Sequence, residues 1–170
     1  IDLHVADLQS GEVTKVSQHE GQAQFGPAAF SPDNQWLYYT ANDQGEFAAL
    51  RRVKLGSWEH EPVRSADWDV VGAGFSHSGK YMTVATNEDG STKVRLYDTA
   101  SGNEVALPVL PAGEIRGLRI ADSETKMAFY LNGDRQPNDL YVLEFGGEPK
   151  QLTTSLNPAI DPADLVDSSV

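Results

Sequence analysis

The sequence predicts an all-β fold built from repeated four-stranded antiparallel units, and three observations carry this prediction. Segments of similar pattern recur every 45 residues along the 170-residue chain. Short apolar and aromatic runs alternate with turns rich in Gly, Pro, Asn, Asp and Ser, as strands alternate with tight turns. No apolar stripe with the 3.6-residue period of a helix reaches a useful length, which disfavours helical repeats of similar size.

Three copies of the repeat align without a gap, and their apolar and loop positions correspond. The matched positions are Phe30, Phe75 and Ile120; Leu37, Met82 and Met127; Tyr39, Val84 and Phe129; and Asn42, Asn87 and Asn132. Four strands in about 45 residues is the pattern of a β-propeller blade. The predicted fold is therefore a β-propeller fragment of about three and a half blades.

The first half of each unit contains the inner strands. Residues 26–30 of the first copy are rich in small side chains, as an innermost strand requires where neighbouring sheets converge. A polar turn follows at residues 31–34, with Pro and Asp placed as a tight turn favours. The next strand, residues 36–40, is apolar and aromatic on both faces, which is typical of a strand buried between stacked sheets.

The second half of each unit contains the outer strands, and the second copy shows them best. The loop at residues 87–90 carries Asn, Asp and Gly and precedes an expected strand at residues 93–97. A further turn leads to a short fourth strand at residues 105–107. Residues 2–7 and 13–16 match a third and a fourth strand, so the chain is expected to begin within a blade.

These matches define the expected domain boundaries. Residues 1–152 form the partial propeller, and residues 153–170, with two prolines and three aspartates, are expected to be a linker towards a missing C-terminal domain. The expected blades are a half blade at residues 1–20 and full blades at residues 25–65, 70–110 and 115–152. A propeller closes with about four to eight blades. The remaining blades are expected elsewhere in the same protein, or two such half-rings self-associate.

Composition restricts the partners. Thirteen Lys and Arg against 25 Asp and Glu leave a net charge of −12 without a basic stripe, so no nucleic acid partner is expected. No window is apolar enough for a membrane span. The chain has no cysteine, which removes disulfides, thiol nucleophiles and zinc–thiolate sites but leaves both a cytoplasmic and a periplasmic location open.

Two of the copies resemble the turn signature of TolB-type, WD40-like propeller repeats, in which Phe-Ser-Pro-Asp-Gly-Lys precedes an apolar strand. The first copy begins at Phe30 with Phe-Ser-Pro-Asp and the second at Phe75 with Phe-Ser-His-Ser-Gly-Lys, while the third has lost most of the signature. Residues 132–143, 151–158 and 160–162 are similar to the final blade and exit linker of prolyl oligopeptidase-family serine peptidases, a group that includes acylaminoacyl and dipeptidyl peptidases.

This resemblance implies a function for the propeller. In that family an N-terminal propeller caps a C-terminal α/β-hydrolase domain, and the cavity between them admits peptides but excludes folded proteins. The catalytic Ser, Asp and His of the family belong to the hydrolase domain, so none is carried onto this chain. The resemblance therefore implies that the segment is non-catalytic and gates peptide access to a partner domain of the same protein.

No catalytic, cofactor or metal residue is predicted within the chain. The string from Gly74 to Gly79 places its second glycine one residue too late for a nucleophile elbow, and Ser76 and His77 lie on the repeat's own turn. The four histidines, His4, His19, His60 and His77, show no metal-ligand spacing. Residues 87–90 fall short of a calcium loop and are expected to be a hairpin connection.

Three tryptophans and one arginine are candidate contact residues. Trp36, Trp58 and Trp68 are expected to pack between blades or against residues 57–69 rather than to bind a ligand. Arg135, on a loop between strands, is a candidate contact for substrate or the adjoining domain, against the alternative of a surface ion pair with a nearby aspartate.

Two other functions compete with the peptidase hypothesis. One is a TolB-type propeller scaffold for protein–protein interaction, with no enzyme attached. The other is a propeller enzyme such as a glycan lyase or glycosidase, for which the sequence singles out no carboxylate pair.

Overall fold

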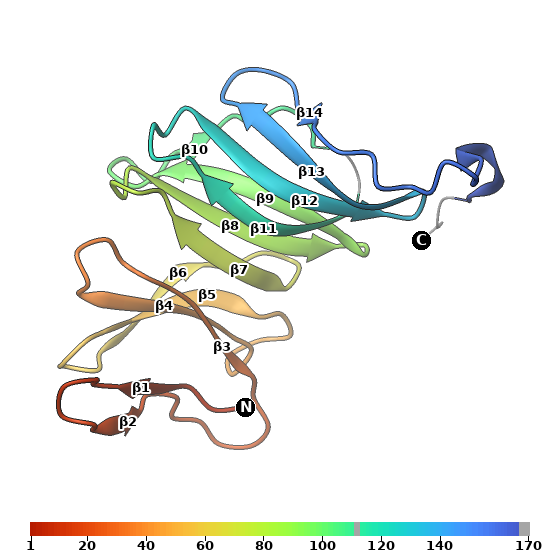
Figure 1. Cartoon of the computed structure of the whole chain (residues 1–170). Coiled ribbons are helices and arrows are strands. Elements are labelled where there is room, and N and C mark those ends of the chain that lie inside the picture. Colours follow the sequence, from red (N-terminus) through yellow and green to blue (C-terminus); the bar gives the residue numbers. More distant parts are fainter. Residues whose placement is uncertain (111–112, 167–170) are drawn as a thin grey trace. The chain divides into compact units, whose positions relative to one another are not determined.

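A computed structural model describes residues 1–110 and 113–166 of the chain (Figure 1). The described residues form fourteen strands in four antiparallel sheets, followed by the short 3-10 helix η1 (Pro162–Asp164). Within them, no helix has the length and apolar character needed to cross a membrane. The chain divides into two compact units, one made of Ile1–Phe75 with Val84–Thr86, the other of Ser76–Thr83 with Asn87–Val170.

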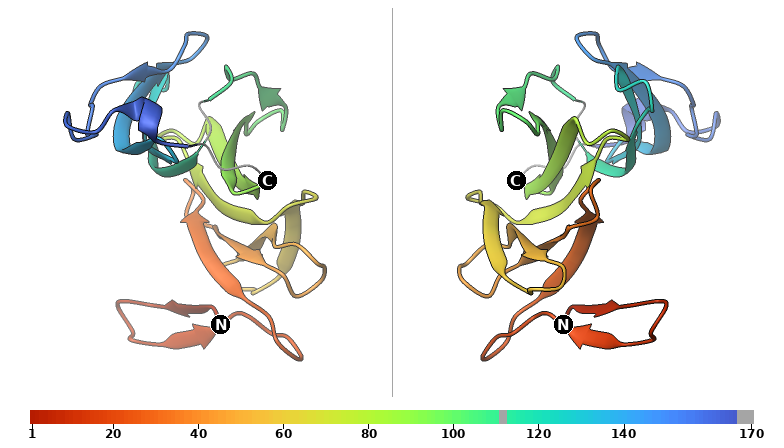
Figure 2. Two further views of the ribbon diagram at one scale, coloured as in Figure 1. Left: turned by 90° about the vertical axis from the view of Figure 1, so that its right-hand side faces the viewer. Right: turned by 90° about the vertical axis from the view of Figure 1, so that its left-hand side faces the viewer.

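The first unit contains a hairpin and a complete four-stranded sheet. The hairpin strands are β1 (His4–Ala6) and β2 (Val13–Lys15). The sheet strands, in spatial order, are β3 (Phe25–Phe30), β4 (Trp36–Ala41), β5 (Ala49–Lys54) and β6 (His60–Arg64). Both views of Figure 2 show the hairpin lying beside this sheet.

The core of the first unit lies between the hairpin and the sheet. Antiparallel register pairs Leu37 with Val53 and Tyr39 with Arg51, so these four side chains share the face towards the hairpin. The buried members of the cluster are Leu3, Val16, Ala23, Phe25, Leu37, Tyr39, Ala41 and Val53. On the opposite face Tyr38 packs edge-on against Phe75, with 4.9 Å between ring centroids. Strand β4 is thus buried on both faces, as its unbroken apolar run predicts.

A second four-stranded sheet has the order β10-β9-β8-β7. Its strands are β7 (Val70–Phe75), β8 (Tyr81–Glu88), β9 (Ser91–Asp98) and β10 (Glu104–Val105). Strand β9 is longer than the expected strand at residues 93–97. Strand β10 is shorter than the expected 105–107, because it pairs with β9 only through Glu104 and Val105, opposite Tyr97 and Leu96.

The third sheet belongs to the second unit. Its strands, in order, are β11 (Glu114–Ile120), β12 (Lys126–Gly133), β13 (Gln136–Glu144) and β14 (Lys150–Gln151). One face is buried through Met127, Phe129, Leu131, Tyr141 and Leu143, and the Phe129 and Tyr141 rings stack with centroids 5.7 Å apart. The alternation of buried and exposed positions along β12 shows that its other face is more exposed.

The turn after the first strand of each four-stranded sheet has the same hydrogen bonding in all three copies. The amide of residue 31, 76 or 121 donates to the carbonyl five residues later, at 2.8 to 2.9 Å. The fourth turn residue takes a left-handed conformation each time, with φ of 54° at Asn34, 78° at Gly79 and 54° at Glu124. The third copy therefore keeps the turn although its sequence has lost the signature.

Candidate functional site

One end of the β3–β6 sheet in the first unit brings together two loops. Antiparallel pairing places the β4–β5 loop, residues 42–48, at the same end as residues 65–69, which follow β6. The Ala48 amide donates to Asp69 Oδ1 at 2.7 Å, and the Val70 amide donates to the Ala48 carbonyl at 2.8 Å. The two loops are therefore fixed to each other by backbone as well as side-chain hydrogen bonds.

An ion pair joins the β4–β5 loop to strand β5. Arg51 Nη1 donates to both carboxylate oxygens of Asp43, at 3.0 and 2.8 Å, and the two side chains are only 15% and 11% exposed. The Arg51 guanidinium also lies 5.9 Å from the centre of the Tyr39 ring. Its Nε is buried and has no hydrogen-bond partner among the described residues. The Arg51–Asp43 pair is neutral overall and mostly buried, and it holds the β4–β5 loop against strand β5.

A second polar contact crosses the same sheet. The Tyr39 hydroxyl lies 2.8 Å from His60 Nδ1. Burial raises the pKa of the Tyr39 hydroxyl, so Tyr39 remains a neutral donor. Burial, and then the charge of Arg51, lower the pKa of His60. At neutral pH the imidazole is therefore uncharged, and its Nδ1 can accept a hydrogen bond from the Tyr39 hydroxyl.

These groups line a cavity of about 240 Å³ between β2 and the sheet. Its walls are aromatic at Phe25, Tyr39 and Trp58 and polar at Lys15, Arg51 and His60. The Lys15 ammonium is already 3.0 Å from Asp2, and Arg51 is paired with Asp43, so the cavity holds little uncompensated charge.

Trp58 has a strained backbone in the wall of this cavity. Its φ is 60°, in the left-handed region that bulky residues rarely occupy. The equivalent turns that follow β1 and β9 carry glycine at this position, Gly11 with φ of 75° and Gly102 with φ of 70°. The Trp58 side chain packs against the core of the first unit. Burial of the indole offsets the free-energy cost of the left-handed backbone. Trp58 therefore has a packing role, as expected for the tryptophans.

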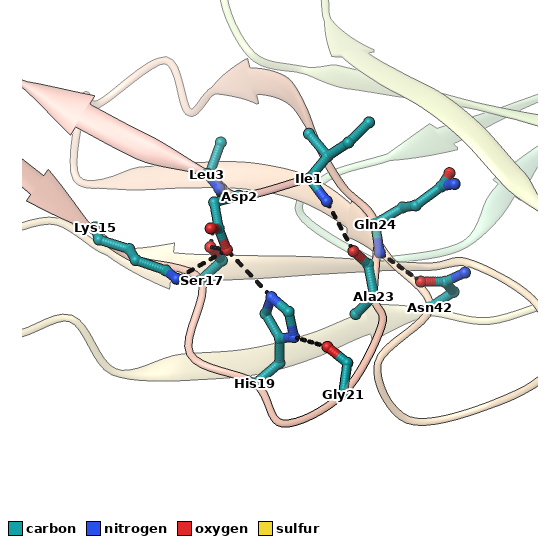
Figure 3. Close-up of polar contacts among 10 residues, drawn as sticks. All are labelled: Ile1, Asp2, Leu3, Lys15, Ser17, His19, Gly21, Ala23, Gln24 and Asn42. Atoms are coloured by element: carbon teal, nitrogen blue, oxygen red, sulfur yellow. Dashed lines mark hydrogen bonds and ion pairs between the residues drawn. The ribbon is translucent and has the colours of Figure 1, made fainter.

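Figure 3 shows a polar cluster around Asp2 that combines the residue types of a serine-hydrolase triad. Ser17 Oγ donates to Asp2 Oδ1 at 3.0 Å, and His19 Nε2 lies 3.1 Å from the same oxygen. A triad requires the serine hydroxyl on the imidazole, whereas here both groups contact the carboxylate. Hydrogen bonds, with that from Lys15 the strongest influence, hold the pKa of Asp2 well below its usual range. The cluster links the hairpin to the segment that follows it.

The predicted turn residues of the second unit lie apart from any such arrangement. Ser76 Oγ accepts from the Tyr81 amide at 2.9 Å, as Ser31 Oγ accepts from the Trp36 amide. His77 is exposed, and its Nδ1 lies 3.9 Å from Asp122. No cluster of three or more His, Cys, Asp or Glu side chains suited to a metal occurs within residues 1–110 and 113–166.

Two predicted loop positions are hairpin turns. Asp89 and Gly90 connect β8 to β9 with φ of 48° and 73°, a backbone that Asp and Gly adopt readily. Arg135 and Asp134 form the two-residue turn between β12 and β13, where Gly133 pairs with Gln136. The Arg135 side chain is exposed. Its predicted contact with substrate or another domain stays a prediction.

The other tryptophans lie on the surface of the first unit. The Arg52 guanidinium stacks 4.1 Å from the centre of the Trp36 ring. Trp68 is 38% exposed and lies 6.3 Å, centroid to centroid, from Phe47. Trp68 thus packs on a neighbouring loop but stays accessible to solvent.

Asp139 is a buried carboxylate that sequence reasoning missed. It is 1% exposed and accepts hydrogen bonds from Thr153 Oγ1 (2.9 Å), the Ser155 amide (2.8 Å) and Gln151 Nε2 (3.0 Å). Burial alone would raise the pKa of Asp139, but these hydrogen bonds outweigh it and hold the pKa below 3.8. Residues 139, 141 and 143 lie on the same face of strand β13, because side chains alternate along a strand. Since Tyr141 and Leu143 are buried, this alternation indicates that Asp139 also points inward.

Solved structures resemble this arrangement of sheets. TolB from Acinetobacter baumannii superposes with a TM-score of 0.69 at 19% identity, covering 91% of this chain and 38% of that one. A prolyl endopeptidase, described in a study of inter-domain dynamics in catalysis and specificity, superposes with a TM-score of 0.62 at 14% identity and covers 92% of this chain. No protein-family model and no curated protein sequence matches the chain.

These likenesses confirm the predicted fold, an all-β set of four-stranded propeller blades, and the predicted resemblance to TolB and prolyl endopeptidase propellers at the level of fold. The chain spans well under half of each solved protein, 38% of the TolB chain and 24% of the prolyl endopeptidase chain.

Proposed function

We propose that this chain is the non-catalytic propeller segment of a prolyl oligopeptidase-like serine peptidase, where it caps a separate α/β-hydrolase domain and limits the access of peptides. The observation that carries the proposal is the fold match over 92% of the chain to 24% of a prolyl endopeptidase chain. A fold by itself does not assign an activity. The proposal therefore also draws on what the described contacts provide.

The polar contacts described above support a role as a non-catalytic cap rather than as a reaction centre. In the first unit the titratable groups of the cavity neutralise one another, as the Lys15–Asp2 and Arg51–Asp43 pairs do. The Asp2 cluster has its serine and histidine on the carboxylate rather than on each other. In the second unit, Asp139 fixes the start of the segment after β14, the part that resembles an exit linker. A fixed exit direction would hold a following domain in place.

The test uses the natural full-length protein. A fluorophosphonate probe should label one serine outside residues 1–170, and peptides of increasing length should be cleaved while a folded protein of the same cleavage sequence is not. Labelling of a serine within residues 1–170, or the absence of both labelling and peptide cleavage, would refute the proposal.

A TolB-type interaction scaffold is the second candidate, favoured by the TM-score of 0.69 and identity of 19% to TolB, both higher than for the prolyl endopeptidase. It predicts no fluorophosphonate labelling and a stable complex with another protein. Chemical cross-linking of the full-length protein in its native cells, followed by mass spectrometry, separates the two candidates. Cross-links confined to one polypeptide favour the cap, whereas reproducible cross-links to one other protein favour the scaffold.

A further inference from the structure

Two exposed aromatic side chains meet at the loop end of the β3–β6 sheet. Phe47, in the β4–β5 loop, is 36% exposed, and Trp68, between β6 and β7, is 38% exposed. Their ring centroids are 6.3 Å apart with an angle of 35° between the ring planes. Large apolar rings on loops leave apolar area in contact with water, and such positions are characteristic of recognition surfaces. We call Phe47, Trp68 and their preceding residues Glu46 and Asp67 the aromatic loop surface.

The loops that carry the rings are held in place without a ligand. The Asp69 carboxylate accepts from the Ala48 amide, and the Ala48 carbonyl accepts from the Val70 amide. Each contact lies next to one of the rings in sequence. A ligand that binds between or over the rings therefore meets a surface already formed, which lowers the entropy lost on binding.

A hollow adjoins this surface. It has a volume of about 410 Å³, and its walls include Glu46, Phe47, Leu50, Pro62 and Arg64. The Arg51–Asp43 pair lines the same hollow and neutralises its own charge. The hollow is large enough for a long side chain of a peptide.

The uncompensated charge at the aromatic loop surface is negative. Glu46 directly precedes Phe47, and Asp67 directly precedes Trp68; both acidic residues are exposed. Within the described part of the chain, neither carboxylate has an ion-pair or hydrogen-bond partner. Each ring is thus accompanied by one unpaired carboxylate.

We infer that the aromatic loop surface binds an extended peptide segment that carries Lys or Arg side chains. A cation over the face of Trp68 or Phe47 gains cation–π attraction, and its charge is balanced by Glu46 or Asp67. The aliphatic stem of the same side chain covers the exposed ring area. The inference is independent of an attached hydrolase, because it concerns only residues of the first unit.

The binding assay is isothermal titration of the 170-residue chain at low salt with three synthetic hexapeptides. They alternate alanine with lysine, with norleucine or with glutamate. We expect binding of the lysine peptide and at least about tenfold weaker binding of the other two, since removing the cation removes both attractions. Equal binding of the lysine and norleucine peptides would overturn the inference.

Two sets of variants place the binding on the chain. Glu46→Gln with Asp67→Asn should weaken the lysine peptide about fivefold, and Phe47→Leu with Trp68→Leu should do the same. The matched control is Glu12→Gln with Glu20→Gln, which changes the net charge equally at two exposed carboxylates of the same unit. The control should weaken binding by less than about twofold.

The control variant also distinguishes binding at the aromatic loop surface from non-specific attraction of a cationic peptide to an acidic protein. If both carboxylate pairs weaken binding equally, or if neither variant set at the aromatic loop surface weakens it, the inference is wrong. The carboxylate variants leave both rings and the loop hydrogen bonds in place, so they test the inference even if the leucine variants fail to fold. Circular dichroism of each variant checks the fold.

Discussion

Arg51 and Asp43 form an ion pair. Removing one partner is expected to lower the free energy of unfolding more than removing both. Each side chain is at most 15% exposed, so each has given up most of its hydration. The two direct hydrogen bonds compensate for that loss only while both partners are present. A buried ion pair commonly costs about 3–5 kcal/mol to break from one side but much less to replace as a whole.

A double-mutant cycle tests this reasoning. Asp43→Asn should lower the free energy of unfolding by about 2–3 kcal/mol, below the fully buried limit because some solvent reaches the pair. Adding Arg51→Met should recover part of the loss, because the unpaired guanidinium is then absent. Urea unfolding followed by tryptophan fluorescence measures the free energy of unfolding of Asp43→Asn, of Arg51→Met and of the double variant. Additive losses would show that the pair is not coupled.

Asp139 is the corresponding residue in the second unit, but its partners are neutral donors rather than a cation. Asp139→Asn should destabilise the chain by about 1–3 kcal/mol. The NH2 group of the asparagine replaces one accepting oxygen, so it faces the donor group of Gln151 or Thr153 and a hydrogen bond is lost. Asp67→Asn, at an exposed and unpaired carboxylate, is the control and should change the free energy of unfolding little.

The same residue predicts a pH dependence. The folded-state pKa of Asp139 lies below the ordinary value of 3.8, so its contribution to stability is fully present above about pH 4. It is lost as the pH falls through the folded-state pKa, where the folded protein must also take up the proton. The difference in unfolding free energy between the parent chain and Asp139→Asn should therefore shrink as the pH is lowered from 5 to about 3. A constant difference over this range would contradict the assignment.

At the scale of the element, the three equivalent turns at residues 31–34, 76–79 and 121–124 show that the backbone conformation forms with or without a serine at the first position. In the first two copies a serine hydroxyl accepts from the amide five residues later, Ser31 from Trp36 and Ser76 from Tyr81. The third copy has Ala121 at this position yet forms the same backbone turn, with Glu124 left-handed. Glu124 accepts from Ser78 at 2.8 to 2.9 Å, which fixes its side chain within the second unit.

Two substitutions test the contribution of the hydroxyl. Ala121→Ser should raise the free energy of unfolding by about 0.5–1 kcal/mol by giving the Lys126 amide an acceptor, and Ser31→Ala should lower it by about 1 kcal/mol. Thermal unfolding of the three proteins measures both changes. A loss of stability in Ala121→Ser would show that the third turn differs from the other two in detail.

At the scale of the whole molecule, one face of the β11–β14 sheet keeps apolar side chains partly exposed among the described residues of the second unit. Ala128 pairs with Val142 and Tyr130 with Leu140, so these four side chains lie together on one face. Tyr130 is 48% exposed, whereas Tyr39 on β4 is 1% exposed. Apolar area of this kind favours association.

The 170-residue chain is therefore expected to self-associate as its concentration rises, which is the second of the two alternatives that the sequence left open for the remaining blades. Tyr130→Lys should shift the molecule towards the monomer, because a charge at the centre of the face is costly to bury. Val109→Lys, at a 93% exposed position of a loop, is the control. Sedimentation equilibrium measures the association. A monomeric parent chain at high concentration would contradict the prediction.

The fold was predictable from the sequence to the level of strands and sheets, while the candidate site was not. The 45-residue period and the turn at residues 31–34 identified the blades, because local turn chemistry and side-chain periodicity repeat along the chain. The aromatic loop surface joins Phe47 and Trp68, which are 21 positions apart in sequence, and no local pattern relates them. Trp68 was expected to pack and was not recognised as an accessible ring.

The sequence alone determined that this protein is an all-β chain of propeller blades, since period and turns are local properties that each copy displays independently. It also determined the acidic balance of 25 carboxylates against 13 basic groups. Only the tertiary structure decided which carboxylates are compensated. Asp43 is mostly buried and paired with Arg51, and Asp139 is buried and hydrogen-bonded by neutral donors. Glu46 and Asp67 have no partner among the described residues. Burial and pairing depend on residues brought together by the register of distant strands, and that register is a property of the folded sheet.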